Sequence, residues 1–472
     1  MIPDILASRY ASPEITSIWS PEGKVRLERE FWIAVMKAQR KLGVDIPETA
    51  ITAYENVREK IDLESISQRE QKLRHDVKSR IEEFCELAGY EHIHKGLTSR
   101  DLTDNVEQLQ ILRSLRLVRS KAVAVLHQLA DWSLHTKYIM LVGRTHNVPA
   151  QPITLGKRLA MFGEEIMFGL GRLDHLIENY PLRGLQGAVG TRLDQLVLMN
   201  GDKKKVQKLG EQVLEHLDCS TSFNAVGQVY PRSLDVETVR ALIAISSGIS
   251  NFAKTLRLMA GQGLASEGFQ QGQVGSSAMP HKMNARTSER INGFHQILNG
   301  YGTMLSGLSG DQWNEGDVSC SVVRRVALPG AFFVSDGQLE AALTVLSEME
   351  FFEAAITQEL QQYLPFLAST TLLMEAMRKG GGRESVYEAI KENAIAVADA
   401  LRNGDLGEND LSQRLADDER VPLDLQEIEA VLNDPERFSA SAPEQAEAFA
   451  SQVRKWTERF PEAKKLVPQV LL

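Results

Sequence analysis

Apolar residues recur every three or four positions along most of this chain, over long stretches that contain no proline. Proline is absent between Pro47 and Pro149 and again between Pro231 and Pro280. Such spacing predicts amphipathic helices, and the lack of proline allows them to be long. The clearest stripes are Leu109, Leu112, Leu115, Val118, Ala122, Val125 and Leu129; Leu242, Ile245, Ile249, Phe252, Leu256 and Met259; and Ile291, Phe294, Ile297, Leu298, Tyr301, Leu305 and Leu308. We therefore expect an all-α protein.

Long helices with one apolar stripe each pack most simply as a bundle, which we place at residues 98–350. Residues 1–97 predict an N-terminal helical domain. Residues 351–472 are interrupted by glycines and predict a C-terminal helical domain. Strand-like patterns are scarce, and Leu182 to Leu198 is the best candidate for a small irregular or strand element. The uncharged run from Ile291 to Gly310 contains several amide side chains, which are costly in lipid, so we interpret it as a buried helix and not a membrane span.

Charge and cysteine content narrow the function classes. The 472 residues carry a formal net charge of −10, so no global positive field exists to gather nucleic acid. The three cysteines form no CxxC pair, which disfavours a disulfide framework or a structural zinc site and suits a reducing cytoplasm. Charged residues near the start interrupt any apolar run, so we expect no secretory signal.

The most informative segment runs from Gly275 to Asn284 with the sequence GSSAMPHKMN. A serine acts as a base only where a cation and backbone N–H groups stabilise its alkoxide. Lys282 can supply the cation, and Asn284 can bind a carboxylate or cap the following helix. A plain Gly/Ser turn with a surface lysine is the alternative, but the length of the pattern favours proton abstraction beside a carboxylate.

A second segment runs from Gly143 to Pro152 and places His146 just before two prolines and a new helix. Histidine can donate a proton near neutral pH, although a lone histidine is more often structural. Its flanking pattern favours an acid–base role.

A third segment runs from His94 to Asp101, where Thr98 and Ser99 stand at the expected start of a long helix. Free N–H groups and two hydroxyls at a helix start suit a carboxylate or phosphate, and N-capping alone is the alternative. Upstream, His75-Asp76-Val77 lies on a charged helix and is weak evidence by itself.

These separate segments support one resemblance. Residues 275–284 resemble the signature loop of the fumarase/aspartase superfamily of lyases. Within that superfamily, Ser8 to Glu14, His75 to Val77, His94 to Ser99 and Thr145 to Gln151 resemble the adenylosuccinate lyase family. Agreement extends from near the N-terminus to about residue 330, and the remainder is less diagnostic.

The resemblance implies a three-domain lyase whose central long-helix bundle assembles into a homotetrameric core with active sites shared between subunits. It implies β-elimination without a cofactor or metal. The substrates would be two succinylated purine nucleotides of de novo purine biosynthesis. Adenylosuccinate would yield AMP and fumarate, and SAICAR would yield AICAR and fumarate.

The resemblance also implies roles for individual residues. The catalytic set is Ser276 as general base, His146 as general acid, Lys282 and His75. Lys282 and Asn284 would hold the succinyl carboxylates. Arg9, Tyr10, Ser321, Arg325 and Arg290 match the nucleotide and phosphate binders. The full set of substrate contacts is Arg9, Tyr10, Asp76, His94, Thr98, Ser99, Gln228, Asn284, Arg290, Ser321 and Arg325.

Two positions depart from the family pattern. Gly316 stands where many members have a phosphate-binding arginine, so we expect Arg324 or Arg325 to carry more of that load. Ala285 follows Asn284 where proline is common. Neither change touches the implied acid or base.

Three other functions remain as alternatives. One is another fumarate-releasing lyase such as argininosuccinate lyase, against which the Ser8-Arg9-Tyr10 and His75-Asp76-Val77 elements favour a nucleotide substrate. A second is a non-catalytic structural protein on the same fold, which the intact Ser276, Lys282 and His146 disfavour. The third is a nucleotide-binding regulator, for which no Walker or GxGxxG element is present.

Overall fold

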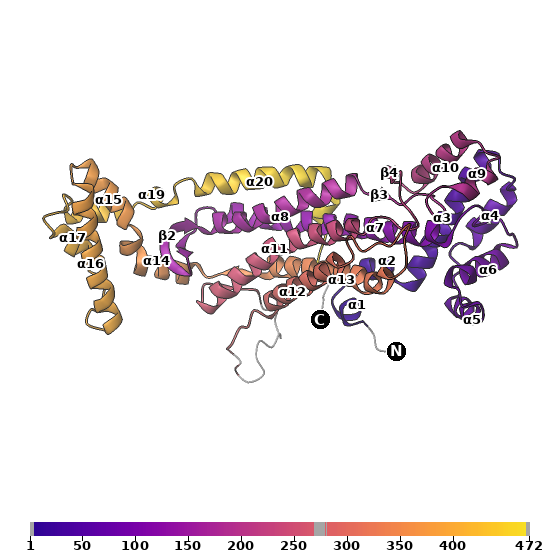
Figure 1. The fold of residues 1–472 in the computed structure, drawn as a ribbon. Coiled ribbons are helices and arrows are strands. Elements are labelled where there is room, and N and C mark those ends of the chain that lie inside the picture. Colours follow the sequence, from indigo (N-terminus) through magenta and orange to yellow (C-terminus); the bar gives the residue numbers. More distant parts are fainter. Residues whose placement is uncertain (1–3, 269–278, 280, 469–472) are drawn as a thin grey trace.

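The computed structural model describes residues 4–268, 279 and 281–468. It is an elongated, mainly helical molecule, which confirms the expected all-α class (Figure 1). Five long helices form its middle. They are α7 (Ser99–His135), α8 (Leu155–Glu178), α11 (Ser233–Gly261), α12 (Arg286–Ser306) and α13 (Cys320–Glu348).

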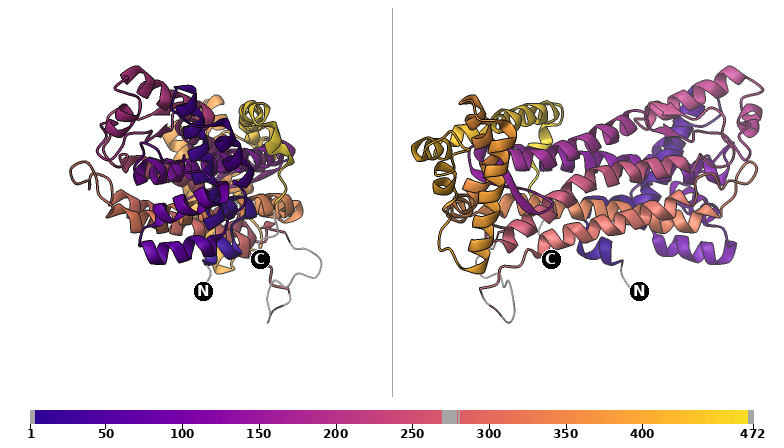
Figure 2. Two further views of the ribbon diagram at one scale, coloured as in Figure 1. Left: turned by 90° about the vertical axis from the view of Figure 1, so that its right-hand side faces the viewer. Right: turned by 60° about the vertical axis from the view of Figure 1, so that its left-hand side comes forward.

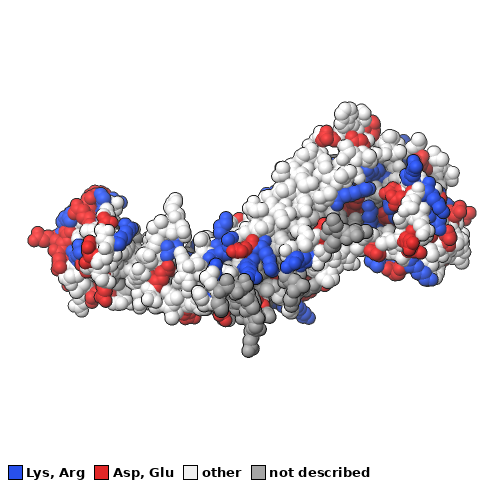
Figure 3. Space-filling model, turned by 90° about the horizontal axis from the view of Figure 1, so that it is seen from below, with Lys and Arg blue, Asp and Glu red and all other residues white. Residues whose placement is uncertain are grey.

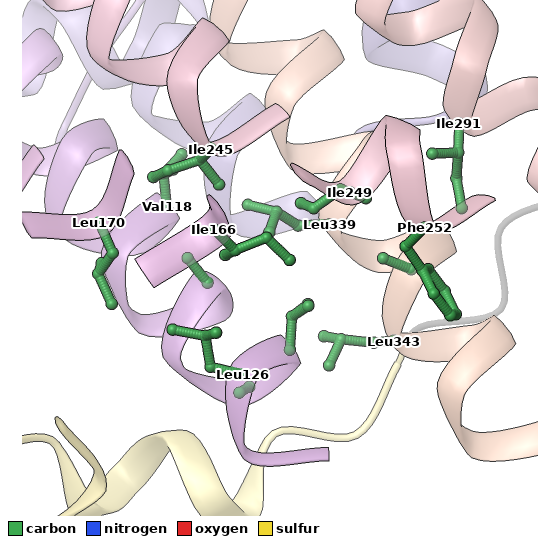
Figure 4. Close-up of a cluster of buried hydrophobic side chains, with 14 of the residues drawn as sticks. Val118, Leu126, Ile166, Leu170, Ile245, Ile249, Phe252, Ile291, Leu339 and Leu343 are labelled. Atoms are coloured by element: carbon green, nitrogen blue, oxygen red, sulfur yellow. The ribbon is translucent and has the colours of Figure 1, made fainter. Parts of the chain in front are cut away.

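The core of this bundle is built from the predicted apolar stripes. Every member of the stripes on α7 and α11 is buried, and Figure 4 shows Val118, Ile166, Ile249 and Leu343 converging from four helices. The α12 stripe is only partly buried, because Ile297 remains 40% exposed. The predicted helix at 291–310 is confirmed, although it starts earlier and ends at Ser306. None of the described helices has the length and apolar character that a bilayer span requires.

The N-terminal part of the chain packs at one end of the bundle, around a second hydrophobic cluster. Two short helices, α1 (Ile5–Arg9) and α2 (Pro13–Trp19), lie along the bundle itself. The cluster is formed by α3 (Pro21–Lys41), α4 (Glu48–Val57), α6 (Asp76–Ala88) and the first turns of α7. The helix α5 (Leu63–Leu73) packs against α6. Two later helices, α9 (Leu193–Leu198) and α10 (Lys203–His216), join it from the middle of the sequence.

The C-terminal part is divided between two cores. A third cluster at the far end is built on α15 (Ser369–Arg378), α16 (Arg383–Asn403), α17 (Leu411–Ala416) and α18 (Leu425–Leu432), as Figure 2 shows from two sides. It is joined to the bundle by α14 (Glu353–Leu367) and α19 (Pro435–Ser439). The chain then returns, and α20 (Ala442–Arg459) packs along α7 and α8, followed by a 3-10 turn at Pro461–Lys465.

Phe449 of α20 explains why this return is tight. Its ring lies where a Cβ at Gly163 of α8 would stand, only 2.0 Å from that position. The last helix therefore completes the central core.

The strands are few and small. β1 (Met140–Thr145) and β2 (Val148–Thr154) form an antiparallel hairpin, which the sequence did not predict because prolines interrupt the alternation. β3 (Pro181–Leu182) pairs with β4 (Thr221–Ser222), and β5 (Ala265–Ser266) pairs with β6 (Glu350–Phe351). Of the irregular or strand element expected across 182–198, Leu182 is in β3 and residues 183–192 are irregular, but Leu193–Leu198 is the helix α9.

Candidate active site

The helices α7, α11 and α13 begin close together, at the end of the bundle that the N-terminal helices cover. Thr98 precedes α7, and its N–H donates to Asp101 Oδ2 at 2.9 Å, which confirms the expected helix start. The other oxygen of Asp101 accepts from Arg183 Nη1 at 2.5 Å and from the N–H groups of Gln186 and Gly187 at 2.8 and 3.0 Å. This buried carboxylate joins the start of α7 to a loop 82 to 86 residues later in the chain.

Arg183 extends the same network towards Gln228. Its Nη2 donates to the carbonyls of Gly187 at 2.8 Å and Gly227 at 3.1 Å. The N–H of Gln228 donates to the carbonyl of Glu315 at 2.6 Å. The predicted contact Gln228 is therefore held by buried polar groups on one side and by the Glu315–Gly316 turn on the other.

That turn accounts for the departure at Gly316. Its φ is +132°, a conformation that side-chain-bearing residues rarely adopt, and a Cβ there would lie 3.0 Å from Val229 Cγ2. An arginine at this position would be strained in this backbone, so glycine suits the turn.

Adjacent arginines at the start of α13 have opposite environments. Arg324 is 3% exposed and donates to Asp235 at 2.7 Å, to Glu107 at 2.5 Å and to the Tyr230 hydroxyl. Burial opposes ionisation of Glu107, but Arg324 and Lys24 outweigh it and lower the pKa of this carboxyl to about 2. The expectation that Arg324 could bind phosphate is wrong, because its guanidinium is already used inside the bundle.

Arg325 and Ser321 remain as candidate phosphate contacts. Arg325 is exposed and Ser321 is half-buried in the first turn of α13. Since α7, α11 and α13 all begin here, their N-terminal N–H groups favour an anion. Thr98, Ser99, Gln228, Ser321 and Arg325 are called the helix-start group below.

The two histidines predicted near this end are structurally different. His75 caps α6, where its Nδ1 accepts from the N–H of Lys78 at 3.2 Å, and its ring is exposed. Burial opposes ionisation of the neighbouring Asp76, but Arg80 outweighs it and the pKa falls. His94 has a positive φ of 64° and accepts from Trp32 Nε1 at 3.1 Å. Burial lowers the pKa of His94 to about 4, so its ring is neutral near pH 7.

A cationic cavity of about 680 Å³ lies where α12 begins. Lys282, Asn284 and His281 line it together with Lys254 and Arg257 of α11. Figure 3 shows lysine and arginine side chains gathered on this face of the bundle. Lys254 and Arg257 carry no sequence motif, so only the fold reveals them. Ser276, the predicted base, lies outside the described residues.

Arg290 and Tyr10 also lie near the start of α12. The ring of Tyr10 packs edge-to-face against Phe294, with 5.2 Å between the ring centroids. Phe294 follows Arg290 by one helical turn, and the exposed Arg9 precedes Tyr10. Arg9, Tyr10 and Arg290 are called the arginine–tyrosine group below.

His146 stands at the tip of the β1–β2 hairpin. His146 and Asn147 form a two-residue turn with φ values of 52° and 62°, as a type I′ hairpin turn requires. The hairpin is fixed to α14 by Arg144, whose Nη2 lies 2.5 Å from Glu359 Oε1. Positive φ is uncommon for histidine, and such strain is typical of functional positions.

Within one chain these groups are far apart. Thr98 and the hairpin lie at opposite ends of α7, whose 37 residues span roughly 55 Å. The arginine–tyrosine group contacts α13 at Gly337, twelve residues and about 18 Å from Arg325. The predicted phosphate binders therefore form two separate groups in a single chain.

Comparison with known proteins supports the same assignment. Residues 10–298 match the family described as Lyase, and residues 365–449 match the adenylosuccinate lyase C-terminus. Adenylosuccinate lyase of Saccharomyces cerevisiae is 30% identical, over 95% of this chain and 93% of its own length. That of Methanothermobacter thermautotrophicus is 29% identical, over 95% and 98%.

Solved structures confirm the fold. The 3-carboxy-cis,cis-muconate lactonizing enzyme from Pseudomonas putida superposes with a TM-score of 0.82 at 20% identity, covering 96% of this chain and 100% of that chain. A fumarate lyase from Mesorhizobium superposes with a TM-score of 0.78 at 19% identity, covering 94% and 98%. Taken with the near-full-length sequence matches, these observations show that the chain belongs to the adenylosuccinate lyase family.

Proposed function

We propose that this protein is an adenylosuccinate lyase that cleaves adenylosuccinate to AMP and fumarate, and SAICAR to AICAR and fumarate. The similarity to adenylosuccinate lyases over 95% of the chain carries this proposal. The predicted site residues support it chemically, because His146, Lys282 and Asn284 stand in accessible positions. We propose that it works without a cofactor, in a reducing cytoplasm where its three cysteines stay free.

The chemistry divides between a base and an acid. The proton beside a succinyl carboxylate is weakly acidic, and its removal by Ser276 places charge on that carboxylate. Lys282 and Asn284 stabilise this charge as it develops. His146 then protonates the departing nitrogen, which is otherwise a poor leaving group. Because the base and the acid are separate groups, Ser276 and His146 can act on opposite faces of the substrate.

We propose that the active sites are shared within a homotetramer. The distance between the hairpin and the helix-start group along α7 supports this, because one substrate cannot touch both in a single chain. Apolar side chains on the outer faces of the long helices supply contact surface. They include Met161 and Phe168 on α8, Ile297 and Met304 on α12, and Val322 and Val326 on α13.

The first experiment is an ultraviolet assay with adenylosuccinate, with AMP and fumarate identified as products. Argininosuccinate serves as the alternative substrate and separates the two lyase activities. Ser276→Ala is the control, since a placed base accounts for about a hundred- to ten-thousand-fold in rate. Normal kcat in a folded, assembled Ser276→Ala protein would contradict the assignment of the base.

Subunit mixing tests the shared sites. Ser276→Ala and His146→Ala subunits, each inactive alone, should regain partial activity when mixed, because some hybrid sites contain neither lesion. Exchange is checked with differently tagged subunits by native mass spectrometry. Demonstrated exchange without any return of activity would exclude shared sites.

A further inference from the structure

A buried polar cluster lies inside the otherwise apolar bundle. Lys121 of α7 pairs with Asp336 and, at 2.6 Å, with Glu340, both on α13, and it donates to Ser12 Oγ at 3.0 Å. Lys121 is 4% exposed, Asp336 0%, Glu340 3% and Ser12 0%. We call these four residues the Ser12 cluster.

Filling a core with such charged residues costs free energy. Desolvation of buried charges offsets much of their attraction, and well-packed apolar residues are often as stable or more so. Stability alone therefore does not explain why these residues are charged. A role in holding the backbone at one position does explain it.

The backbone that the cluster fixes is that of Ser12, in the segment after α1. The N–H of Ser12 donates to Asp336 Oδ2 at 2.7 Å. Next to it, Gly337 faces the carbonyl of Tyr10 so closely that a Cβ there would lie 2.7 Å from that oxygen. The helix α1 buries only Leu6 fully, and Ala7, Tyr10 and Ala11 are partly buried against the core. The backbone that follows Arg9 and Tyr10 is thus tied to α13 at Ser12, beside the packing of the Tyr10 ring on Phe294.

We propose that Asp336 and Lys121 of the Ser12 cluster act as a positioning element, which holds the Ser12 backbone and thereby sets Arg9 and Tyr10 in place for the substrate phosphate. The proposal rests on the proposed function, because it assigns Arg9 and Tyr10 to nucleotide binding. Asp336 is the central residue, since one carboxylate serves both the Lys121 ammonium and the Ser12 N–H. An asparagine of the same shape has only one acceptor oxygen and cannot serve both.

The test compares Asp336→Asn with Glu340→Gln. Both changes remove one negative charge beside Lys121, but only Asp336 contacts the Ser12 backbone. Asp336→Asn should raise KM for adenylosuccinate about tenfold, the effect of roughly one weakened charged hydrogen bond, with kcat nearly unchanged. Glu340→Gln should leave KM unchanged. A dephosphorylated substrate analogue should show no difference between the wild type and Asp336→Asn.

Gly337→Ala provides a second route that leaves the charges intact and displaces Tyr10 directly. It should raise KM in the same way, whereas Gly171→Ala, where nothing lies within 4 Å of the added Cβ, should not. If Asp336→Asn does not fold, Gly337→Ala decides the question. Calorimetric titration with AMP gives the same comparison without turnover.

The outcomes separate the two proposals. A wild type that releases no fumarate from adenylosuccinate contradicts the proposed function. A wild type that turns over normally, with unchanged KM and AMP affinity in Gly337→Ala and in folded Asp336→Asn, contradicts only the positioning role. Equal losses on the dephosphorylated analogue overturn it as well.

Discussion

The helix-start group and the hairpin tip hold their candidate residues in opposite ways. At the helix starts, Asp101 and Arg183 are fully buried and bind the backbone around Thr98 and Gln228. At the hairpin, His146 is exposed on a two-residue turn, and the Arg144–Glu359 pair links the hairpin to α14. Binding residues gain from a rigid frame made by the chain itself. The exposed tip suits the role proposed for His146, a proton donor to a substrate held by another subunit.

The largest effect is expected at the tip. His146→Ala should reduce kcat by about a hundred- to ten-thousand-fold, because a general acid is lost, with almost no change in unfolding free energy. Steady-state kinetics and thermal unfolding measure the two quantities. Asn147→Gly, in the same turn, is the matched control and should keep most activity. A large fall in stability in His146→Ala would show that the tip is structural.

For the buried helix starts we expect the main effect on stability. Asp101→Ala leaves Arg183 buried without its partner, so it should lower the unfolding free energy by about 3–5 kcal/mol. Denaturant unfolding checks this. Asp131→Ala, an exposed acid on the same helix, should change little. If both variants unfold alike, the network at the helix start contributes no special stability.

A smaller effect separates Arg325 from its buried neighbour. Arg325→Ala should raise KM for adenylosuccinate by the loss of one or two charge-assisted bonds, about 1.5–3 kcal/mol each, and should spare stability. A dephosphorylated analogue should be affected much less, because it lacks the group being bound. Equal losses on both substrates would mean that Arg325 is a structural residue and that the phosphate lies elsewhere.

The smallest effect concerns pH. The pKa of His94 falls to about 4 in the folded protein from an ordinary 6.5, so the unfolded chain binds the extra proton first. Stability from this residue is complete above pH 6.5 and is lost as pH falls towards 4, by about 2 kcal/mol at pH 5. Unfolding of wild type and His94→Gln at pH 7.5 and 5 measures the difference. An identical pH dependence in both would contradict the assignment to His94.

Local patterns predicted what depends on local physics. The stripe on α7 and the helix start at Thr98 follow from spacing and capping, and both are present. The division of labour between Arg324 and Arg325 was not predictable. Neighbours on a helix point about 100° apart, and which one lies inside depends on Asp235, 89 residues away.

The hairpin shows another limit of local pattern. Its register joins residues on either side of His146, but Pro149 and Pro152 remove the alternation that identifies a strand. Similarly, no feature of α20 indicates that Phe449 must fit against Gly163, since that contact spans almost 300 residues. The role of Ser276 as the base remains a prediction from its sequence motif.

Because α20 returns to the bundle, the cluster of α15 to α18 is an insertion within the chain and not a C-terminal extension. Both of its connections, α14 and α19, pack against the β1–β2 hairpin of the bundle. A module tethered at two points has fewer ways to swing than one hanging from a single linker. Its sequence can therefore diverge between relatives without loosening the central bundle, because the ends that it must join are fixed.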